Sequence, residues 1–509
     1  MKRILFVAAL MAAALTTSIP QAQMRVSPVD DEHGHVALGL ALRHLANTGV
    51  FLHTTAHPDD ENNPLLVMLN RGQGYRTALA TATRGNGGQN EIGPEIFEPL
   101  GVLRTEELAS LHRWDGAEQY FTRAVDFGYS FGIDETFEKW GRPEITADYV
   151  RLLRTIRPDV VIALPETGNA GGQHHMASAN ITRDAVKLAG DPTKFPEQIA
   201  EGLKPWQVKK FYFSAGFGFP GEPQQPGKLT RVNTAVYDQL LGKTYAEIGA
   251  EERSMHKCQG MGQLLALPGP AAASYRLAET VIPEQPDETN LFAGIDSSLA
   301  SLARFGGATP PKELVDGLAT LTADVQAAQK RYDTEGDAAT IAPLAEGLRH
   351  ARALIATIKG LSAIPDVGRY DLDMRLRQKE KEFQQALIEA NGIRLEALAD
   401  DGVVVPGQAV KVQAIVANRG AADVTMKRVS FGGFEGTGAC ELRPVTSQGF
   451  GPPGSRQRNA GAPAGPVVNV VKRDMAVDCE PSLSIPAAAR MTEPYWHRKG
   501  YDGRYTFDA

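Results

Sequence analysis

The chain has 509 residues, of which 42% are hydrophobic and 22% are charged, and this composition predicts a globular protein of about two to four domains. Its formal net charge of −7 excludes nucleic acid as a main partner, because binding to phosphates requires a basic surface. The chain also has no polybasic segment with which to bind anionic membranes.

The first residues have the layout of a secretory signal peptide. Lys2 and Arg3 precede a short apolar run, Ile4 to Leu15, and small residues follow with a cleavage site after Ala22. A membrane anchor is the alternative reading, but the run is shorter than the roughly 20 residues that span a bilayer. We therefore expect residues 1–22 to be removed and the mature protein to be periplasmic or secreted, with no stable membrane span.

Three cysteines are too few for a disulfide framework or for a four-cysteine zinc site. Cys440 and Cys479 both lie in the C-terminal region and can pair in an oxidising compartment, which leaves Cys258 single.

Strand and helix patterns alternate through the first half of the chain. Strands are predicted at Gly49–Thr55, Tyr75–Thr83 and Asp159–Leu164, and helices at Asn63–Arg71, Glu98–Asp115, Ala147–Arg157 and Ala177–Leu188. This alternation predicts an α/β fold over residues 40–275, a Rossmann-like, mostly parallel sheet with flanking helices. The loops HPDDE, RGNGGQ and GNAGGQHH each follow a predicted strand. Because ligands bind at the carboxyl ends of such strands, we expect the three loops to meet at one edge.

Two different regions follow. Residues 287–393 carry apolar residues at helical spacing, which predicts about two to four antiparallel helices that act as a scaffold. Residues 394–509 alternate apolar and polar residues between Gly, Pro and Asn turns, which predicts a β-sandwich-like domain. The chain stops at YTFDA without a clear finishing strand, so we expect the sandwich to be incomplete or the natural chain to continue.

The AHPDDE segment carries the first candidate chemistry. His57 and Asp60 lie three residues apart on a turn after a strand, where both side chains can reach one point, and an imidazole with a carboxylate suits Zn²⁺. Asp59 can then accept the proton of a water held by the metal. The alternative is a helix start whose aspartates favour the positive end of the dipole.

A histidine pair supplies the remaining ligand. His174 and His175 follow a different predicted strand, and two histidines with one aspartate leave a fourth zinc position open for water. On its own the pair is more often a surface feature. Paired aspartates also hold Mg²⁺, as in metal phosphoesterases, but two histidines favour zinc.

Two arginines are candidates for substrate binding. Arg84 opens the Gly-rich loop Arg84–Gly93, whose amides suit the hydroxyl and carbonyl groups of a sugar, although a purely structural loop is an equal alternative. The loop lacks the Lys-Ser/Thr pair of a phosphate loop. Arg104 lies three residues from Glu107 on a predicted helix; the two form a surface ion pair, or Arg104 turns into the site to bind substrate.

These segments resemble a known family. AHPDDE, TRGNGGQN, LRTEEL and the later histidine pair, over roughly residues 45–260, resemble the PIG-L / LmbE-like zinc deacetylases. The resemblance implies zinc ligands at His57, Asp60 and His175, a general base at Asp59 and a substrate contact at Arg104. The family's first histidine of the later motif, which helps to stabilise the oxyanion, falls at Gly172, so His174 or another group must take its role.

We therefore expect an exported zinc-dependent hydrolase that removes an N-acetyl group from an amino sugar or glycoconjugate. The helical and β regions are similar to those of large exported members of the family, which suggests a glycan substrate by analogy. The alternatives are an amidase on a larger conjugate and a catalytically weakened carbohydrate-binding protein, which the glycine at position 172 favours.

Overall fold

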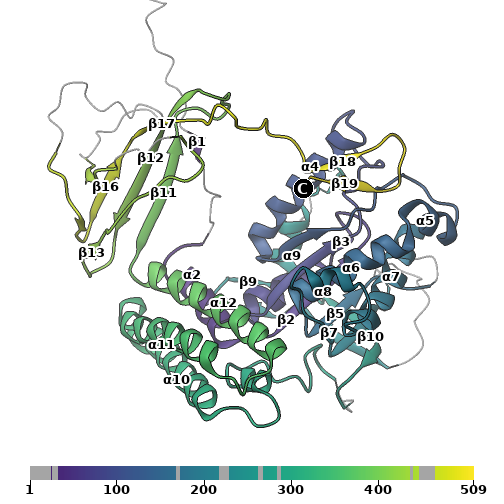
Figure 1. Cartoon of the computed structure of the whole chain (residues 1–509), viewed down its shortest axis with the longest axis horizontal. Coiled ribbons are helices and arrows are strands. Elements are labelled where there is room, and N and C mark those ends of the chain that lie inside the picture. The colour runs from purple at the N-terminus through teal and green to yellow at the C-terminus, as the bar shows by residue number, and fades with distance from the viewer. Residues whose placement is uncertain are drawn as a thin grey trace, which may run out of the picture. The chain divides into compact units, whose positions relative to one another are not determined.

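The computed structural model describes residues 24–25, 32–167, 172–216, 228–261, 267–283, 288–435, 440–445 and 465–508. The chain divides into two compact units, one made of residues 35–387 with 494–509 and the other of residues 1–34 with 388–493 (Figure 1). The predicted signal peptide lies outside the described residues.

A mostly parallel sheet forms the centre of the larger unit, as predicted. Its strands are β2 (Val50–Thr55), β3 (Arg76–Thr81), β4 (Glu118–Phe121), β5 (Val160–Ala163), β6 (Lys210–Ser214), β7 (Leu229–Asn233) and β10 (Ala272–Thr280). Their order is β4-β3-β2-β5-β6-β10-β7. The run from β4 to β6 is parallel, and β10 is antiparallel to both of its neighbours. A short ribbon, β8 (Tyr237–Asp238) with β9 (Lys243–Thr244), is separate from this sheet.

Helices cover both faces of this sheet (Figure 1). The helices of this part are α2 (His35–Ala46), α3 (Asn63–Val67), α4 (Glu98–Asp115), α5 (Ile133–Trp140), α6 (Arg142–Ile156), α7 (Gln173–Ala189), α8 (Pro196–Ala200) and α9 (Tyr245–Arg253), and a π-helical turn, Met68–Gly72, continues α3. One core joins α5, α6 and α7 to the sheet, and another joins α3 and α9 to its opposite face. Burial of these apolar side chains is the main force that holds the layers together.

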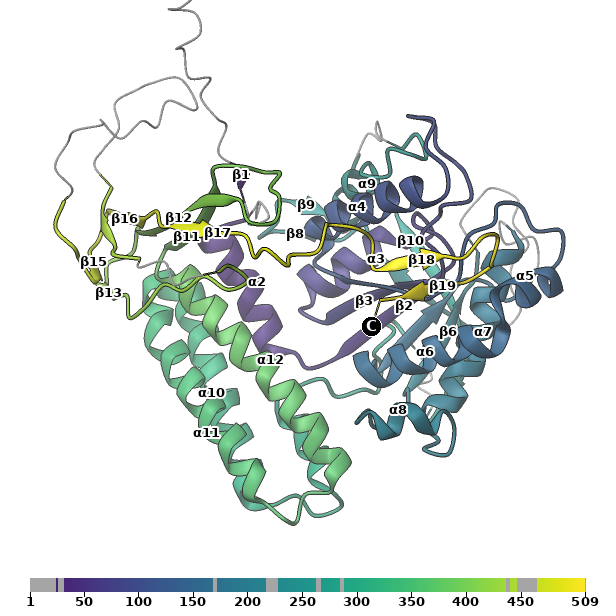
Figure 2. The same cartoon turned by 45° about the horizontal axis from the view of Figure 1, so that its top comes forward.

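The predicted helical region is present. It consists of η2 (Ala300–Gly306), α10 (Lys312–Glu335), η3 (Asp337–Thr340), α11 (Ile341–Gly360) and α12 (Asp366–Ala390). Figure 2 shows the three long helices side by side. The described residues thus form three long helices here, α10, α11 and α12, which agrees with the predicted number of about two to four.

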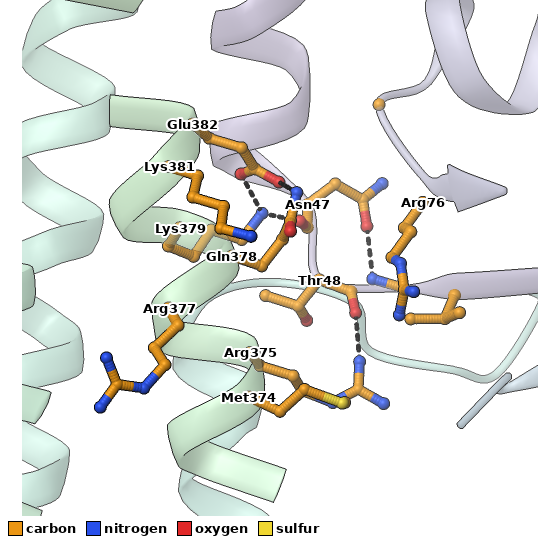
Figure 3. A pocket seen from close by; sticks show the side chains of 13 residues that line it. Asn47, Thr48, Arg76, Met374, Arg375, Arg377, Gln378, Lys379, Lys381 and Glu382 are labelled. Atoms are coloured by element: carbon orange, nitrogen blue, oxygen red, sulfur yellow. Dashed lines mark hydrogen bonds and ion pairs between the residues drawn. The ribbon is translucent and has the colours of Figure 1, made fainter. Parts of the chain in front are cut away.

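Helix α12 is anchored to the chain just before β2. The Arg375 guanidinium donates to the Thr48 carbonyl at 2.7 Å, and the Lys379 ammonium donates to the His44 carbonyl at 2.6 Å and pairs with Glu382 at 2.7 Å. Figure 3 shows Thr48, Arg375, Lys379 and Glu382 around a cavity of about 280 Å³. This cavity lies at the start of β2 and thus at the strand end opposite the HPDDE turn. Its basic residues are Arg76, Arg375, Arg377, Lys379 and Lys381. Most of them are bound to nearby carboxylates or carbonyls, so we regard this cavity as part of the helix attachment.

The smaller unit is built from antiparallel strands. Its sheet contains β1 (Met24–Arg25), β11 (Ile393–Ala399), β12 (Ala409–Asn418), β14 (Arg443–Pro444), β16 (Met475–Cys479) and β17 (Ser482–Ser484), with a separate ribbon of β13 (Val424–Thr425) and β15 (Val470–Val471). A disulfide joins Cys440 to Cys479, whose Cα atoms lie 5.3 Å apart, and this confirms the expected pairing. Cys258 is free and buried, also as expected.

The end of the chain belongs to the larger unit, which corrects the prediction that residues 394–509 form one domain. Strands β18 (Trp496–Arg498) and β19 (Tyr505–Phe507) form a hairpin. Its Trp496 and Tyr505 pack against Val125, which follows β4, because their apolar surfaces are buried there. Among the described residues, we find no helix that combines the length and the apolar character needed to cross a bilayer.

Candidate metal centre and active site

The HPDDE segment forms a tight turn directly after β2. The Asp60 Oδ2 atom accepts hydrogen bonds from the backbone nitrogens of Ala56 at 3.1 Å and His57 at 2.7 Å. Asp59 has a φ of 107°, which is rare for a residue with a side chain. The turn is thus closed by its own carboxylate, and such local strain is typical of functional sites.

Helix α7 brings the third predicted ligand to this turn. His57 Nδ1 lies 3.1 Å from His175 Nε2 and 3.5 Å from Asp60 Oδ2, and His175 Nε2 lies 3.1 Å from Asp60 Oδ1. Tetrahedral zinc with bonds of about 2.0–2.1 Å holds its ligand atoms about 3.3 Å apart. The donor set and its spacing therefore fit Zn²⁺, which His57, Asp60 and His175 would hold. Burial alone would raise the pKa of Asp60, but the two imidazoles hold it well below its usual range.

Asp59 is held beside this cluster from several directions. Its backbone nitrogen donates to Glu61 Oε2 at 3.0 Å, its carbonyl accepts from Arg253 at 2.9 Å, and its carboxylate lies 3.1 Å from Arg104. Burial and the neighbouring Asp60 raise the pKa of Asp59 to about 6, while Arg104 opposes this rise. A fixed carboxylate with a pKa near neutrality is suited to proton transfer.

Arg104 lies behind Asp59 and not in the cavity. Its side chain is 1% exposed, and its guanidinium donates to the carbonyls of Gly85 at 2.9 Å and Pro58 at 2.5 Å as well as to Asp59. Glu107 instead accepts from the backbone nitrogen of Cys258 at 2.8 Å. Arg104 is therefore a positioning residue, which holds the Asp59 carboxylate in place. Helical spacing gives the face of α4 on which Arg104 lies, but it does not give the depth at which that face is buried.

His174 lies on the other side of the His57 ring. Its Nδ1 atom is 3.0 Å from His57 Nε2 and 3.7 Å from Asp126 Oδ1, and its ring packs between Phe127 and Trp140. Burial lowers the pKa of His174 to about 3, so the ring is neutral. The His57 ring is thus held between Asp60 and His175 on one side and His174 on the other. Asp126 belongs to no recognisable motif, so its place in the site was not predicted from the sequence.

Gly172 is the N-cap of α7 and lines the cavity. Its φ is 147°, and a Cβ atom built there would meet no atom of the described residues within 4 Å. Within the described part of the chain, nothing therefore fills the position at which the family resemblance places a histidine.

The Gly-rich loop forms another wall of the cavity, whose volume is about 600 Å³. Gly87, Gly88 and Gln89 line it, opposite residues of the loop after β4. A Cβ atom at Gly87 would lie 2.4 Å from both the backbone nitrogen of Gly128 and the Asp126 carboxylate. Glycine is thus required at position 87 because the two loops meet there.

Arg84 lies outside this cavity. Its side chain is 1% exposed, and its guanidinium stacks 3.5 Å from the Trp496 ring centre and 4.0 Å from that of Phe121. It donates to Thr105 Oγ1 at 3.0 Å and to the Tyr495 hydroxyl at 2.8 Å. These contacts hold the C-terminal hairpin, so the geometry does not support the predicted substrate contact.

Comparison with known proteins agrees with this geometry. Residues 52–186 match the family model described as PIG-L: GlcNAc-PI de-N-acetylase. The chain is 28% identical to a 1D-myo-inositol 2-acetamido-2-deoxy-alpha-D-glucopyranoside deacetylase of Streptomyces scabiei, over 31% of this chain and 53% of that protein. It is 26% identical to the corresponding deacetylase of Streptomyces griseus, over 52% of this chain and 96% of that protein. It is also 26% identical to a mycothiol S-conjugate amidase of Streptomyces coelicolor, over 39% and 72% of the two chains.

The chain thus spans just over half the length of the first curated relatives, 53% and 58%. Among solved structures, it resembles an N,N'-diacetylchitobiose deacetylase from Pyrococcus horikoshii with 17% identity and a TM-score of 0.32, over 42% of this chain and 71% of that one. A conserved protein from Thermus thermophilus is similar at 18% identity and a TM-score of 0.31, over 47% and 97% of the two chains.

Proposed function

We propose that this chain, whose residues 52–186 form a PIG-L family domain, is a zinc-dependent N-deacetylase that acts on an amino sugar or glycoconjugate. The observation that carries the proposal is the cluster of His57, Asp60 and His175, whose ligand atoms lie 3.1 to 3.5 Å apart beside the fixed carboxylate of Asp59. The substrate class rests on the sugar deacetylases to which the chain is similar.

Each residue of the site then has a separate task. When bound, zinc supplies a Lewis acid that polarises the acyl carbonyl and lowers the pKa of water. Asp59 accepts the proton of the attacking water and passes it to the leaving amine. Arg104 holds the Asp59 carboxylate, and His174 fixes the ring of His57 through their hydrogen bond. The Gly-rich loop shapes the wall on which the sugar lies.

An amidase that cleaves a larger conjugate is the second candidate. The similarity to a mycothiol S-conjugate amidase favours it, and a cavity of about 600 Å³ leaves room for more than an acetyl group. Both candidates use the same chemistry and differ in the acyl group removed. The geometry gives less support to a weakened sugar-binding protein, because the base and the proposed ligands are all in place.

We also propose that the protein is exported, because its first 22 residues have the layout of a signal peptide. The disulfide between Cys440 and Cys479 supports this proposal, since such bonds persist in oxidising compartments.

The test combines metal analysis with acetate release from N-acetylglucosamine and its oligomers. We expect the purified protein to hold zinc in stoichiometric amount, and Asp59→Asn to keep zinc while kcat falls by about 10²- to 10⁴-fold. The matched control is Asp134→Asn, a change at an exposed aspartate of α5. An Asp59→Asn protein as active as the wild type, or a zinc-free protein that is fully active, contradicts the mechanism.

A further inference from the structure

Two large aromatic side chains stand exposed on the loop between β4 and α5. Tyr129 is 78% exposed and Phe131 is 86% exposed. Their ring centres are 5.0 Å apart and their planes meet at 78°. The two rings of Tyr129 and Phe131 thus form one angled aromatic surface, which we call the shelf. Exposed aromatic pairs of this size are uncommon, because burying them stabilises a fold, and they mark binding surfaces.

The loop that carries this pair is fixed in place. The backbone nitrogen of Phe131 donates to Glu135 Oε2 at 2.9 Å, and the Ser130 hydroxyl donates to the Gly132 carbonyl at 3.0 Å. The Thr136 hydroxyl donates to Ser130 Oγ at 2.9 Å. The two rings are therefore held outward by a network that includes the first turn of α5, which lowers the entropy cost of binding a ligand.

The shelf continues the catalytic cavity. Tyr129 and Ser130 line that cavity together with His57 and Asp59, and Phe131 comes next along the loop. The nearby loop start is tied to the site, because the backbone nitrogen of Gly128 donates to Asp126 Oδ1 at 2.9 Å. A substrate whose acyl group reaches the proposed zinc ligands extends towards the shelf with the rest of its length.

We propose that Tyr129 and Phe131 form a subsite for a second sugar ring, so that the substrate is an oligosaccharide and not a lone amino sugar. This deepens the proposed function and rests on it. A pyranose presents C–H groups on its faces, which pack on aromatic rings, and hydroxyls at its edge, which need polar partners.

The cavity that Tyr129 lines supplies such polar partners, namely Gln89 and Gln173. An alkyl chain would leave these groups without hydrogen bonds and would need an apolar groove to bury its length. The chemistry of the rim therefore favours a glycan over a lipid chain.

The experiment compares substrates of increasing length. We measure kcat/KM for acetate release from N-acetylglucosamine and from its β-1,4-linked trimer, and take the trimer-to-monomer ratio. Phe131→Ala should lower this ratio about tenfold, the size expected for one lost ring contact, and Phe131→Trp should retain it. Tyr501→Ala is the matched control, because Tyr501 is an aromatic residue that is 95% exposed on the C-terminal hairpin.

A binding measurement separates this proposal from the catalytic one. Calorimetry with the zinc-loaded Asp59→Asn protein should show that the trimer binds and that adding Phe131→Ala weakens binding about tenfold. If nothing is hydrolysed but this binding persists, the subsite stands and the proposed function fails. If acetate is released and Phe131→Ala keeps the wild-type ratio, the subsite is refuted and the function stands. A preference for an octyl glycoside over the trimer that Phe131→Ala abolishes assigns the shelf to a lipid chain and overturns the proposal.

Discussion

Replacing Arg84 by Met removes a buried guanidinium that contacts Tyr495 and Trp496 near the C-terminus. Two hydrogen bonds from a charged group are worth about 1.5–3 kcal/mol each, and stacking on aromatic rings adds about 0.5–2 kcal/mol each. The cost of burying the cation opposes these gains, since burial also lowers the pKa of Arg84. We therefore expect Arg84→Met to destabilise the protein by about 3 kcal/mol, which is below the summed gains of at least about 4 kcal/mol because the cost of burying the cation is subtracted from them.

The assay distinguishes a structural role from substrate binding. In a unit of this size, a loss of about 3 kcal/mol lowers the melting temperature by about 4 °C, and hydrogen exchange should rise first in β18 and β19. We expect KM to change less than about twofold, because the guanidinium does not line the cavity. Arg113→Met is the control, since Arg113 is exposed on α4. Unchanged stability together with a tenfold higher KM refutes this reasoning. That result would make Arg84 a substrate-binding residue, as predicted from the sequence alone.

Three further predictions follow from the contacts of single residues. His174→Ala removes the partner of His57 Nε2 and should weaken zinc binding about 10- to 100-fold in a chelator competition; an unchanged affinity contradicts the positioning role. Gly87→Ala places a Cβ atom 2.4 Å from two atoms of the opposite loop and should lower both kcat/KM and the melting temperature, whereas Gly132→Ala, which meets no atom within 4 Å, should do neither. Cations hold the pKa of buried Asp159 below its usual range despite burial. Its stabilisation is thus present above about pH 4 and is lost as the pH falls further, so Asp159→Asn should flatten the acid limb of a stability–pH curve, and an unchanged limb speaks against it.

Local sequence was sufficient to predict the turn at the centre of the site. The hydrogen bonds that close it join Asp60 to Ala56 and His57, all within five residues. The strand before it is buried along its whole length, as predicted, and the alternation of strand and helix patterns made its place in a parallel sheet predictable. Helix α7 was predicted to begin at Ala177, but it begins at Gln173. This earlier start places the histidine pair in the first turn of α7.

The sequence did not predict how deeply the two arginines are buried or which distant residues they contact. Arg84 and Arg104 are of a residue type that often binds substrates, but each side chain is buried by groups that lie far from it in the chain. The hydroxyl that binds Arg84 belongs to Tyr495, 411 positions away, and the carboxylate that binds Arg104 belongs to Asp59, 45 positions away. Spacing along one helix gives neither partner. Asp126 was missed for the same reason, because only the fold brings it to His174.

The glycine at position 172 affects which groups can stand beside the acyl group of the substrate. His174 is occupied by the hydrogen bond to His57 and is 3% exposed, so its ring is poorly placed to replace a histidine that would face the acyl group. A side chain at position 172 would meet no atom of the described residues within 4 Å, and this position borders the same cavity as Tyr129. A site with more room and fewer charged donors would depend more on contacts remote from the reacting bond for orienting the substrate. This reasoning ties the two proposals together: the fewer donors Gly172 leaves beside the acyl group, the more the rate should depend on a sugar ring bound at Tyr129 and Phe131.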